Sequence, residues 1–161
     1  MTGQQFNEIV DKYSDNVYRF ILKSINNQQE AEDVVQGAFE RLWKNRKNVE
    51  FEKAKSYLFT TAYHLMIDSI RKNKRERNID ISDENRYSCL NNYSDLSEIL
   101  TEALAKLPNL QKNLILLRDY EGYSYKEIGQ ITDLNESQVK VYIFRARKLL
   151  KNYIGKIENV I

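Results

Sequence analysis

Apolar residues recur every three or four positions along nearly the whole chain, which is the spacing of a helix that buries one face. In the first half the pattern predicts three helices, over about Thr2 to Ser24, Gln29 to Asn45 and Glu52 to Arg77. Residues 45–52 have no period and are predicted to be a loop. We expect the second helix to bury Ala31, Val34, Val35, Ala38, Phe39, Leu42 and Trp43, and the third to bury Leu58, Phe59, Ala62, Leu65, Met66 and Ile70.

In the second half, two helices are predicted over about Leu96 to Leu107 and Asn109 to Tyr120. A short helix follows, because Ser124 and Glu127 have the spacing of a capping box at a helix start. Gly129 lies where a second helix could approach closely. The buried pair of this short helix is expected to be Ile128 and Ile131.

The segment Asp133–Leu134–Asn135 breaks the helical pattern, because Asp and Asn favour turns and helix caps. A second short helix is predicted to open at Asn135 or Glu136. Two short helices joined by a tight turn form a helix-turn-helix. The second one is expected to bury Val139, Ile143, Ala146, Leu149 and Leu150.

Few residues in this chain would break helices, since it contains one Pro and five Gly, and strand-like alternation is scarce. The fold class is therefore predicted to be all-α. Residues 78–95 are polar, acidic and weakly periodic, which indicates a flexible linker. We expect two small helical domains, residues 1–77 and 96–161, the second a four-helix domain with the helix-turn-helix.

Composition excludes several classes of protein. Cys89 is the one cysteine, so no disulfide within the chain and no zinc-binding spacing exist, which fits a reducing cytoplasm. No apolar signal segment and no run of transmembrane length occur, so we expect no membrane insertion. We also expect no cofactor and no metal site. The formal net charge of +2 says little about partners.

The distribution of charge is more informative than the total. Residues 138–156 contain no acidic residue, but they contain Lys140, Arg145, Arg147, Lys148 and Lys151. A cationic second helix of a helix-turn-helix suits the DNA major groove, where phosphates supply affinity and base edges supply specificity. The alternative is an ordinary helical hairpin with a solvated basic face.

Two other charged surfaces stand out. The third helix ends in a cationic run between Arg71 and Arg77, which could hold a nucleic-acid backbone while preceding aromatics stack on bases. Cations also stabilise a helix end through its dipole, although that explains only one or two of them. On the second helix an acidic and amide face could dock a basic partner or could simply aid solubility. Periodicity alone favours the second interpretation of that face, which comprises Glu32, Asp33, Gln36 and Glu40.

Catalysis has weak support in this sequence. His64 and Asp68 are four apart on one helix and could form an acid–base pair. No nucleophile, metal cluster or phosphate-binding glycine loop accompanies them, so no catalytic residue is predicted. A free-standing helix-turn-helix regulator would explain residues 124–151, but not the second basic surface or the acidic face.

Four stretches, in order along nearly the full chain, carry a further pattern. Residues 31–36 read AEDVVQ, with Phe39 and Leu42–Trp43 following, and residues 57–72 read YLFTTAYHLMIDSIRK. Leu107–Pro108 precedes residues 116–129, which end in EGYSYKEIG, and residues 139–150 read VKVYIFRARKLL. Together they resemble the extracytoplasmic-function (ECF) group of bacterial RNA polymerase sigma factors, whose patterns are AEDxxQ…F…LW, W/YLFxxAxNxxxDxxR, LP…L…EGxSYxEIA and VKxxxxRARxxL.

The resemblance implies a sigma factor that binds core RNA polymerase and directs promoter-specific initiation at −35 and −10 elements, without catalysis of its own. In the group, the face of the second helix docks the clamp helices of the polymerase, which implies binding by Asp33 and Gln36, with Glu32 and Glu40. The loop and third helix recognise and help melt the −10 element, which implies roles for Asn48, Tyr57, Thr60, Thr61 and His64, with Arg71, Lys72 and Arg75 on the DNA backbone.

The helix-turn-helix of the group reads the −35 element. By position this implies Ser137, Gln138, Lys140, Val141, Tyr142, Arg145 and Lys148. Many members carry Gly-Thr before Val-Lys and Ser-Arg after it, whereas this chain has Ser137–Gln138 and Val141–Tyr142. Without that Arg a phosphate or guanine contact is lost, so the −35 preference cannot be copied from other members. His64 also stands where Asn is frequent. Members are commonly held by anti-sigma partners, so an anti-sigma factor is a candidate third partner besides core RNA polymerase and promoter DNA.

Overall fold

The computed structural model describes residues 1–77 and 95–160, with side chains described for residues 1–76 and 98–156. Every regular element in these ranges is a helix, so the all-α prediction is confirmed. The chain divides into two compact units, Met1–Arg86 and Tyr87–Ile161. The predicted linker lies outside the described residues except for Asp95, and so does Cys89.

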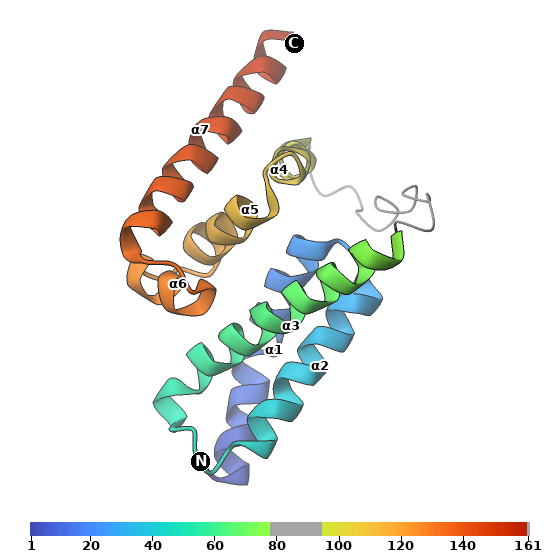
Figure 1. The fold of residues 1–161 in the computed structure, drawn as a ribbon. Helices are drawn as coiled ribbons and strands as arrows, with labels where there is room; N and C mark the ends of the chain where they lie inside the picture. The colour runs from blue at the N-terminus through green and yellow to red at the C-terminus, as the bar shows by residue number, and fades with distance from the viewer. Residues whose placement is uncertain (78–94, 161) are drawn as a thin grey trace. The chain divides into compact units, whose positions relative to one another are not determined.

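The first unit consists of three long helices that all contact one another (Figure 1). They are α1 (Gly3–Ile25), α2 (Gln28–Lys44) and α3 (Ala54–Arg77), and a 3₁₀ turn, η1 (Phe51–Lys53), leads into α3. The three predicted helices are confirmed, with bounds that differ by up to two residues. The predicted loop is shorter than expected, because η1 begins at Phe51.

Buried side chains from all three helices form the core of the first unit. The Phe20 and Phe59 rings of α1 and α3 lie 5.9 Å apart between centroids. Most of the predicted buried positions of α2 and α3 are confirmed, namely Ala31, Val34, Ala38, Leu42, Leu58, Phe59, Ala62 and Met66, while Val35, Phe39, Leu65 and Ile70 are half-buried.

Trp43 is the exception, because 42% of its surface is exposed. It lies at the last turn of α2. The Phe6 and Trp43 ring centroids are 4.9 Å apart with the rings inclined at 65°, and the Arg46 Cζ lies 3.8 Å from the Trp43 ring centroid. The prediction that Trp43 is buried is therefore wrong, because the last turn of α2 leaves the indole partly exposed.

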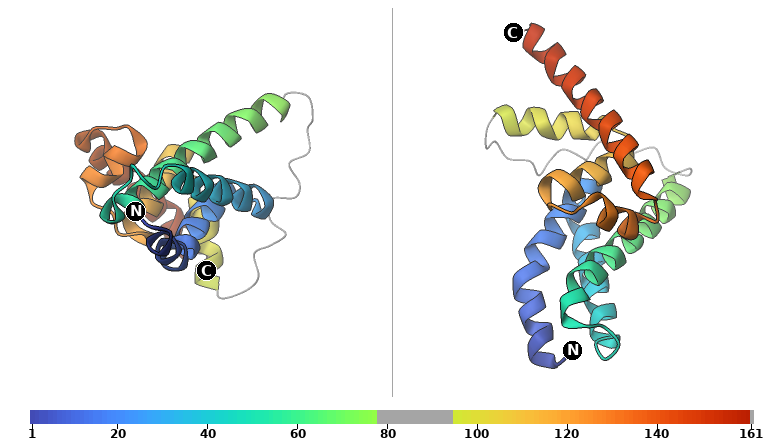
Figure 2. Two further views of the ribbon diagram at one scale, coloured as in Figure 1. Left: turned by 90° about the horizontal axis from the view of Figure 1, so that it is seen from below. Right: turned by 90° about the vertical axis from the view of Figure 1, so that its left-hand side faces the viewer.

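The second unit contains α4 (Asp95–Ala105), α5 (Asn109–Ile115), η2 (Leu116–Tyr120), α6 (Tyr125–Thr132) and α7 (Glu136–Val160). Helix α7 contacts α4, α5 and α6, and it is the longest element in the described ranges (Figures 1 and 2). Helix α4 ends two residues earlier than predicted, ahead of Pro108. The predicted helix from Asn109 to Tyr120 is continuous, but its last part is a π-turn.

The turn between α6 and α7 is built as the sequence indicates. Ser124 and Glu127 exchange backbone-to-side-chain hydrogen bonds of 3.1 Å each, which confirms the capping box. Asp133 adopts the left-handed conformation (φ 59°) and closes α6. A Cβ on Gly129 would lie 2.5 Å from the Leu134 carbonyl oxygen, so glycine is required by the backbone of the turn itself, rather than by the body of a second helix.

Helix α7 differs from the short helix predicted, because it continues to Val160 over 25 residues. Val139, Ile143 and Ala146 are buried as predicted, but Leu149 is 47% exposed and Leu150 half-buried. The prediction that both leucines are buried is therefore wrong, because this part of α7 leaves Leu149 facing solvent. No helix in the described part of the chain is long and apolar enough to span a membrane.

Candidate functional site

One exposed face of α2 carries the predicted acidic and amide surface. Glu32, Asp33, Gln36 and Glu40 are all exposed. Gln36 Nε2 donates to Glu40 Oε1 at 3.3 Å, and Gln28 Nε2 donates to Glu32 Oε1 at 3.3 Å. These bonds link residues one turn apart on α2 and leave the carboxylates in solvent. The face extends about 12 Å along the helix axis and could dock a basic or hydrogen-bonding surface.

The turn after α2 is fixed by residues that the sequence analysis did not single out. Asn45 Nδ2 donates to the Arg41 carbonyl oxygen and to the Tyr57 hydroxyl, both at 3.0 Å. The Asn48 amide donates to the Asn45 carbonyl at 2.9 Å, and the Asn48 side chain is exposed. Asn45 therefore connects the segment after α2 to the first turn of α3. The same hydrogen-bonded network includes Asn48 and Tyr57, and both of these residues are predicted to contact DNA.

A second anchor holds the same turn. The Arg46 guanidinium donates to the Trp43 carbonyl at 2.8 Å and stacks over the Trp43 ring. The Met1 amino group donates to the Arg46 carbonyl at 2.9 Å. Aromatic residues next to an arginine could have indicated such stacking, but sequence alone cannot distinguish it from a nucleic-acid contact.

The predicted −10 residues share one face of α3. Tyr57, Thr60, Thr61 and His64 are half-buried and follow the i, i+3, i+4, i+7 spacing. Arg71, Lys72 and Arg75 continue this face two to three turns farther on and are exposed. The uninterrupted helix thus brings all seven residues into one band about 27 Å long, with a cationic end.

Two contacts bear on this band. The His64 ring meets the Tyr63 ring edge to face, with centroids 5.6 Å apart. Asn73 Nδ2 donates to a carboxylate oxygen of Glu30, which joins the cationic end of α3 to the start of α2.

Asp68, the other member of the hypothetical acid–base pair, is exposed on the same band. Among the described residues, no group of His, Cys, Asp and Glu could hold a metal ion.

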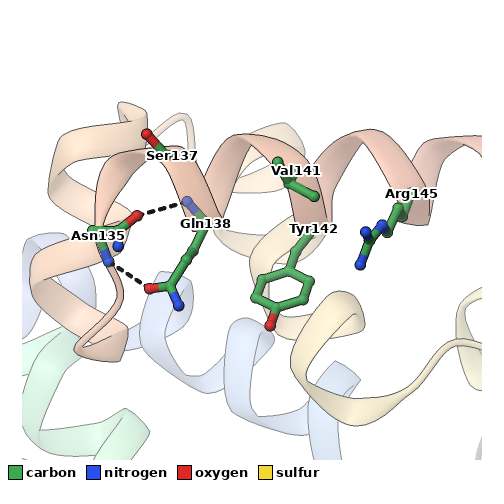
Figure 3. Close-up of a pocket in the computed structure, with 6 residues that line it drawn as sticks. All are labelled: Asn135, Ser137, Gln138, Val141, Tyr142 and Arg145. Atoms are coloured by element: carbon green, nitrogen blue, oxygen red, sulfur yellow. Dashed lines mark hydrogen bonds between the residues drawn. The ribbon is translucent and has the colours of Figure 1, made fainter.

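At the start of α7, Gln138 has a structural role that the sequence analysis missed. The Gln138 amide donates to Asn135 Oδ1 at 2.8 Å, and the Asn135 amide donates to Gln138 Oε1 at 3.0 Å (Figure 3). This reciprocal pair is a second capping box, with Asn135 as the N-cap. The predicted −35 contact through Gln138 therefore uses a side chain whose oxygen already holds the helix end.

The rest of the predicted −35 set lies along one side of α7. Ser137, Lys140, Val141, Arg145 and Lys148 are exposed, and Tyr142 is half-buried. A shallow groove of about 270 Å³ runs along this side, lined by Asn135, Ser137, Gln138, Val141, Tyr142 and Arg145 (Figure 3). The face combines cations with apolar surface. Phe144, which was not predicted, is 70% exposed beside it.

Contacts with neighbouring elements hold this face in place. The Tyr125 ring of α6 lies close to two cations: the Arg118 Cζ is 4.5 Å from the ring centroid and the Lys140 Nζ is 5.8 Å from it. Arg147 donates to Asp119 of η2 at 2.7 Å, and this hydrogen bond raises the pKa of Arg147 further above its already high value. Arg147 is thus engaged within the unit. Arg145, Lys148 and Lys140 are exposed, although Lys140 also lies near Tyr125 and pairs with Glu136 at 3.5 Å.

Comparison with known families assigns a different region to each unit. Residues 9–76 match the Sigma-70 region 2 family, which covers α2, the turn and α3. Residues 97–150 match the Sigma-70, region 4 family, which covers the helix-turn-helix. Both matches include the surfaces described above.

Whole-length relatives agree with these regional matches. The chain is 32% identical over 151 residues to the ECF RNA polymerase sigma factor SigM of Bacillus subtilis, covering 89% of this chain and 91% of SigM. It is 30% identical over 166 residues to the ECF RNA polymerase sigma factor SigW of the same organism, covering 92% of this chain and 88% of SigW.

Two solved structures share the fold. One is the sigma factor RpoE in complex with the anti-sigma factor NepR from Bartonella quintana, with a TM-score of 0.79, 22% identity, and coverage of 93% of this chain and 96% of RpoE. The other is CnrH in complex with the cytosolic domain of CnrY, with a TM-score of 0.70, 20% identity, and coverage of 94% and 88%.

Proposed function

The chain belongs to the ECF RNA polymerase sigma factors, and we propose that its two units divide promoter recognition between them. The first unit would bind core RNA polymerase through α2 and the −10 element through the turn and α3. The second would bind the −35 element through α7. The observation that carries this division is that an acidic face on α2 and a basic face on α7 belong to separate units, each of which matches a different sigma region.

Polymerase binding is assigned to Asp33 and Gln36, with Glu32 and Glu40 around them. Their exposure on one helical face supports this assignment. The Gln36–Glu40 hydrogen bond also supports it, because this bond stays within α2 and can be exchanged for a bond to a partner at little cost. A surface of carboxylates and amides selects a partner that presents cations and hydrogen-bond donors, and opposite charge also accelerates encounter.

DNA opening is assigned to the band on α3 and to Asn48. Taking a base out of the stack costs a few kcal/mol, so contacts to the unstacked base must compensate. Tyr57, Thr60, Thr61 and His64 offer two aromatic rings and several hydrogen-bonding groups at the end nearest the turn. Arg71, Lys72 and Arg75 would neutralise backbone phosphates at the other end.

Recognition of the −35 element is assigned to Ser137, Lys140, Val141, Tyr142, Arg145 and Lys148. All of them except the half-buried Tyr142 are exposed along the first four turns of α7. This supports the assignment, because the recognition helix of a helix-turn-helix contacts base edges with its N-terminal residues. Gln138 belongs to this set by position, and it would contact DNA only while also capping the helix.

The wider setting follows from the same proposal. The protein would act in the cytoplasm and without catalysis of its own. Its two domains would correspond to residues 1–77 and 96–161. An anti-sigma factor would be a natural partner, since both structural relatives above were solved with one or with a cytosolic domain bound. A free-standing helix-turn-helix regulator is not favoured, because it leaves the region 2 match of the first unit without a role.

A pull-down with purified bacterial core RNA polymerase tests the proposal. The full chain should bind tightly, and an Asp33→Ala, Gln36→Ala variant should bind at least tenfold more weakly. The matched control is Gln4→Ala with Asp11→Ala, which removes the same residue types from exposed positions of α1. No binding by the folded parent, or equal loss in both variants, would refute the assignment to α2.

A further inference from the structure

Two large apolar side chains stand out on the exposed side of α7. Val141 is 46% exposed and Phe144 is 70% exposed, the highest value for a large apolar residue among the described side chains. They are three residues apart and are therefore neighbours on one helical face. The buried stripe of the same helix, through Val139, Ile143 and Ala146, lies on the opposite side. Packing within the unit therefore does not account for this pair.

Cations surround the pair. Lys140 and Lys148 lie one turn before and one turn after Phe144, and Arg145 lies one turn after Val141. Residues 137–157 include no Asp or Glu in the sequence. An apolar pair with a cationic rim fits a partner that offers regularly spaced negative charge around an apolar group. A second copy of this face would bring like charges together, which disfavours self-association.

Duplex DNA combines regularly spaced phosphate charges with an apolar group at one kind of base, thymine. In the major groove the four bases present hydrogen-bond donors and acceptors, and thymine alone adds an apolar group, its C5 methyl. Hydrocarbon side chains cannot read donors and acceptors, but they can bury that methyl. We propose that Val141 and Phe144 read thymine methyl groups in the −35 element. This inference rests on the proposed function, in which α7 enters the major groove.

The proposal accounts for the departure of this chain from the Ser-Arg pattern. Where Val141 replaces Ser, a hydroxyl that could bond to any base edge is exchanged for a methyl-reading surface. Phe144 enlarges that surface by a whole ring, which can cover a second thymine or its sugar. Arg145 and Lys148 would hold the adjacent phosphates.

The experiment compares thymine with deoxyuridine, which lacks only the methyl group. The full chain first selects its tightest duplex from a library in which one helical turn is randomised. Each thymine of that duplex is then replaced singly by deoxyuridine, and Kd is measured by fluorescence anisotropy. Loss of one buried methyl should raise Kd about fourfold at one or two positions.

Variants assign the effect to residues. Val141→Ala with Phe144→Ala should bind thymine and deoxyuridine duplexes equally, because the surface that reads the methyl is gone. Both residues are exposed, so the fold should be retained, and a circular dichroism melt checks this. Leu149→Ala is the matched control: Leu149 is 47% exposed on the same helix but lies two turns beyond Val141, so this variant should keep the discrimination.

The possible outcomes distinguish failure of the thymine-methyl proposal from failure of the proposed −35 recognition. A parent that selects a sequence yet tolerates every deoxyuridine substitution would overturn the inference and leave −35 recognition standing. A parent that selects no sequence would overturn both. If the double variant kept the discrimination but lost a self-association detected by sedimentation, the pair would serve contact between copies, and the inference would again be wrong.

Discussion

The Arg147 guanidinium donates a 2.7 Å hydrogen bond to the Asp119 carboxylate and so joins α7 to the π-turn η2. The two residues are 28 positions apart in the sequence. The extra residue of a π-turn changes which side chains face a neighbouring helix, and such turns are frequent at functional sites. In this chain Asp119 lies within the π-turn and contacts α7 through Arg147.

A double-mutant cycle on Asp119→Ala and Arg147→Ala should give a coupling free energy of about 0.5 kcal/mol. Both side chains are more than a third exposed, and such pairs contribute about 0.2–1 kcal/mol. Urea denaturation followed by circular dichroism measures the cycle, and high salt should reduce the coupling. Strictly additive single changes would show that the pair does not position α7.

The two helical glycines of the second unit should respond in opposite ways to alanine. Gly155→Ala should stabilise the unit by about 0.5–1 kcal/mol, because its Cβ would meet no atom within 4 Å and alanine favours the helix. Gly129→Ala should destabilise it by about 1 kcal/mol or more, because the Leu134 backbone must move away from the new Cβ.

Thermal unfolding of the full chain measures both variants. Trp43 is the one tryptophan and lies in the first unit, so its fluorescence provides an internal control. The fluorescence transition should stay in place while the circular dichroism transition shifts down for Gly129→Ala and up for Gly155→Ala. An unchanged or upward shift for Gly129→Ala would show that the turn relaxes around the added methyl, and a downward shift for Gly155→Ala would show that its Cβ is not accommodated.

Gln138 can be tested for its two roles separately. Gln138→Glu keeps the capping box, because Glu serves equally well at that position, but it adds a negative charge to the DNA-facing side. The melting temperature should therefore stay unchanged, while the affinity for duplex DNA falls about fivefold or more, since repulsion at 4 Å in water is about 1 kcal/mol. Gln138→Ala should instead lower the stability, by about 0.5–1 kcal/mol. Unchanged DNA affinity in Gln138→Glu would place this residue away from DNA.

The parts that the sequence predicted depend on local spacing. The faces of α2, α3 and α7 follow from residues three and four apart, so the periodic pattern alone brings Asp33 next to Gln36 and Val141 next to Arg145. The capping box at Ser124 is also local, and it was predicted for the same reason. Long uninterrupted helices with few breakers made these predictions reliable.

The parts that were wrong or missed depend on where elements end and what lies across from them. Trp43 follows the inner stripe, but its exposure depends on the rim of the bundle and on stacking by Arg46. Leu149 and Leu150 both fit the helical period, but the period does not show how far the core extends along α7, and neither side chain is fully buried. Phe144 could have been noticed as an apolar residue outside the stripe, although isolated exposed apolar residues are common and carry no signal alone.

The cationic end of α3 should matter for DNA opening rather than for −35 binding. Arg71→Ala with Arg75→Ala should lower the fraction of open promoter complex severalfold, because two phosphate contacts near the melted strand are lost. The readout is fluorescence of 2-aminopurine placed in the −10 element, with reconstituted polymerase. Lys74→Ala is the control, since Lys74 is exposed on the same helix but lies about 100° from Arg75. Because Lys74→Ala removes one charge and the double variant two, a loss about half as large as that of the double variant would show that only total charge matters.

The basic face of α7 should set the salt dependence of −35 binding. Each phosphate contact releases counterions, so removing one lowers the slope of log K against log salt by about 0.9. Lys140→Ala and Arg145→Ala should each lower the slope by up to this amount and leave polymerase binding unchanged, because both side chains belong to the second unit. Lys140 has a competing contact, a 3.5 Å ion pair with Glu136, so its effect should be the smaller of the two.

Lys156→Ala completes this test as a matched control. Lys156 is an exposed cation on the same helix, about 24 Å along the axis from Lys140 and beyond the turns that reach base edges. Its removal should leave the slope unchanged while altering the net charge by the same amount. If all three variants changed the slope equally, binding would depend on the overall charge of α7, and the assignment of a recognition face would be refuted. If Arg145→Ala reduced polymerase binding as well, the division of roles between the two units would be wrong.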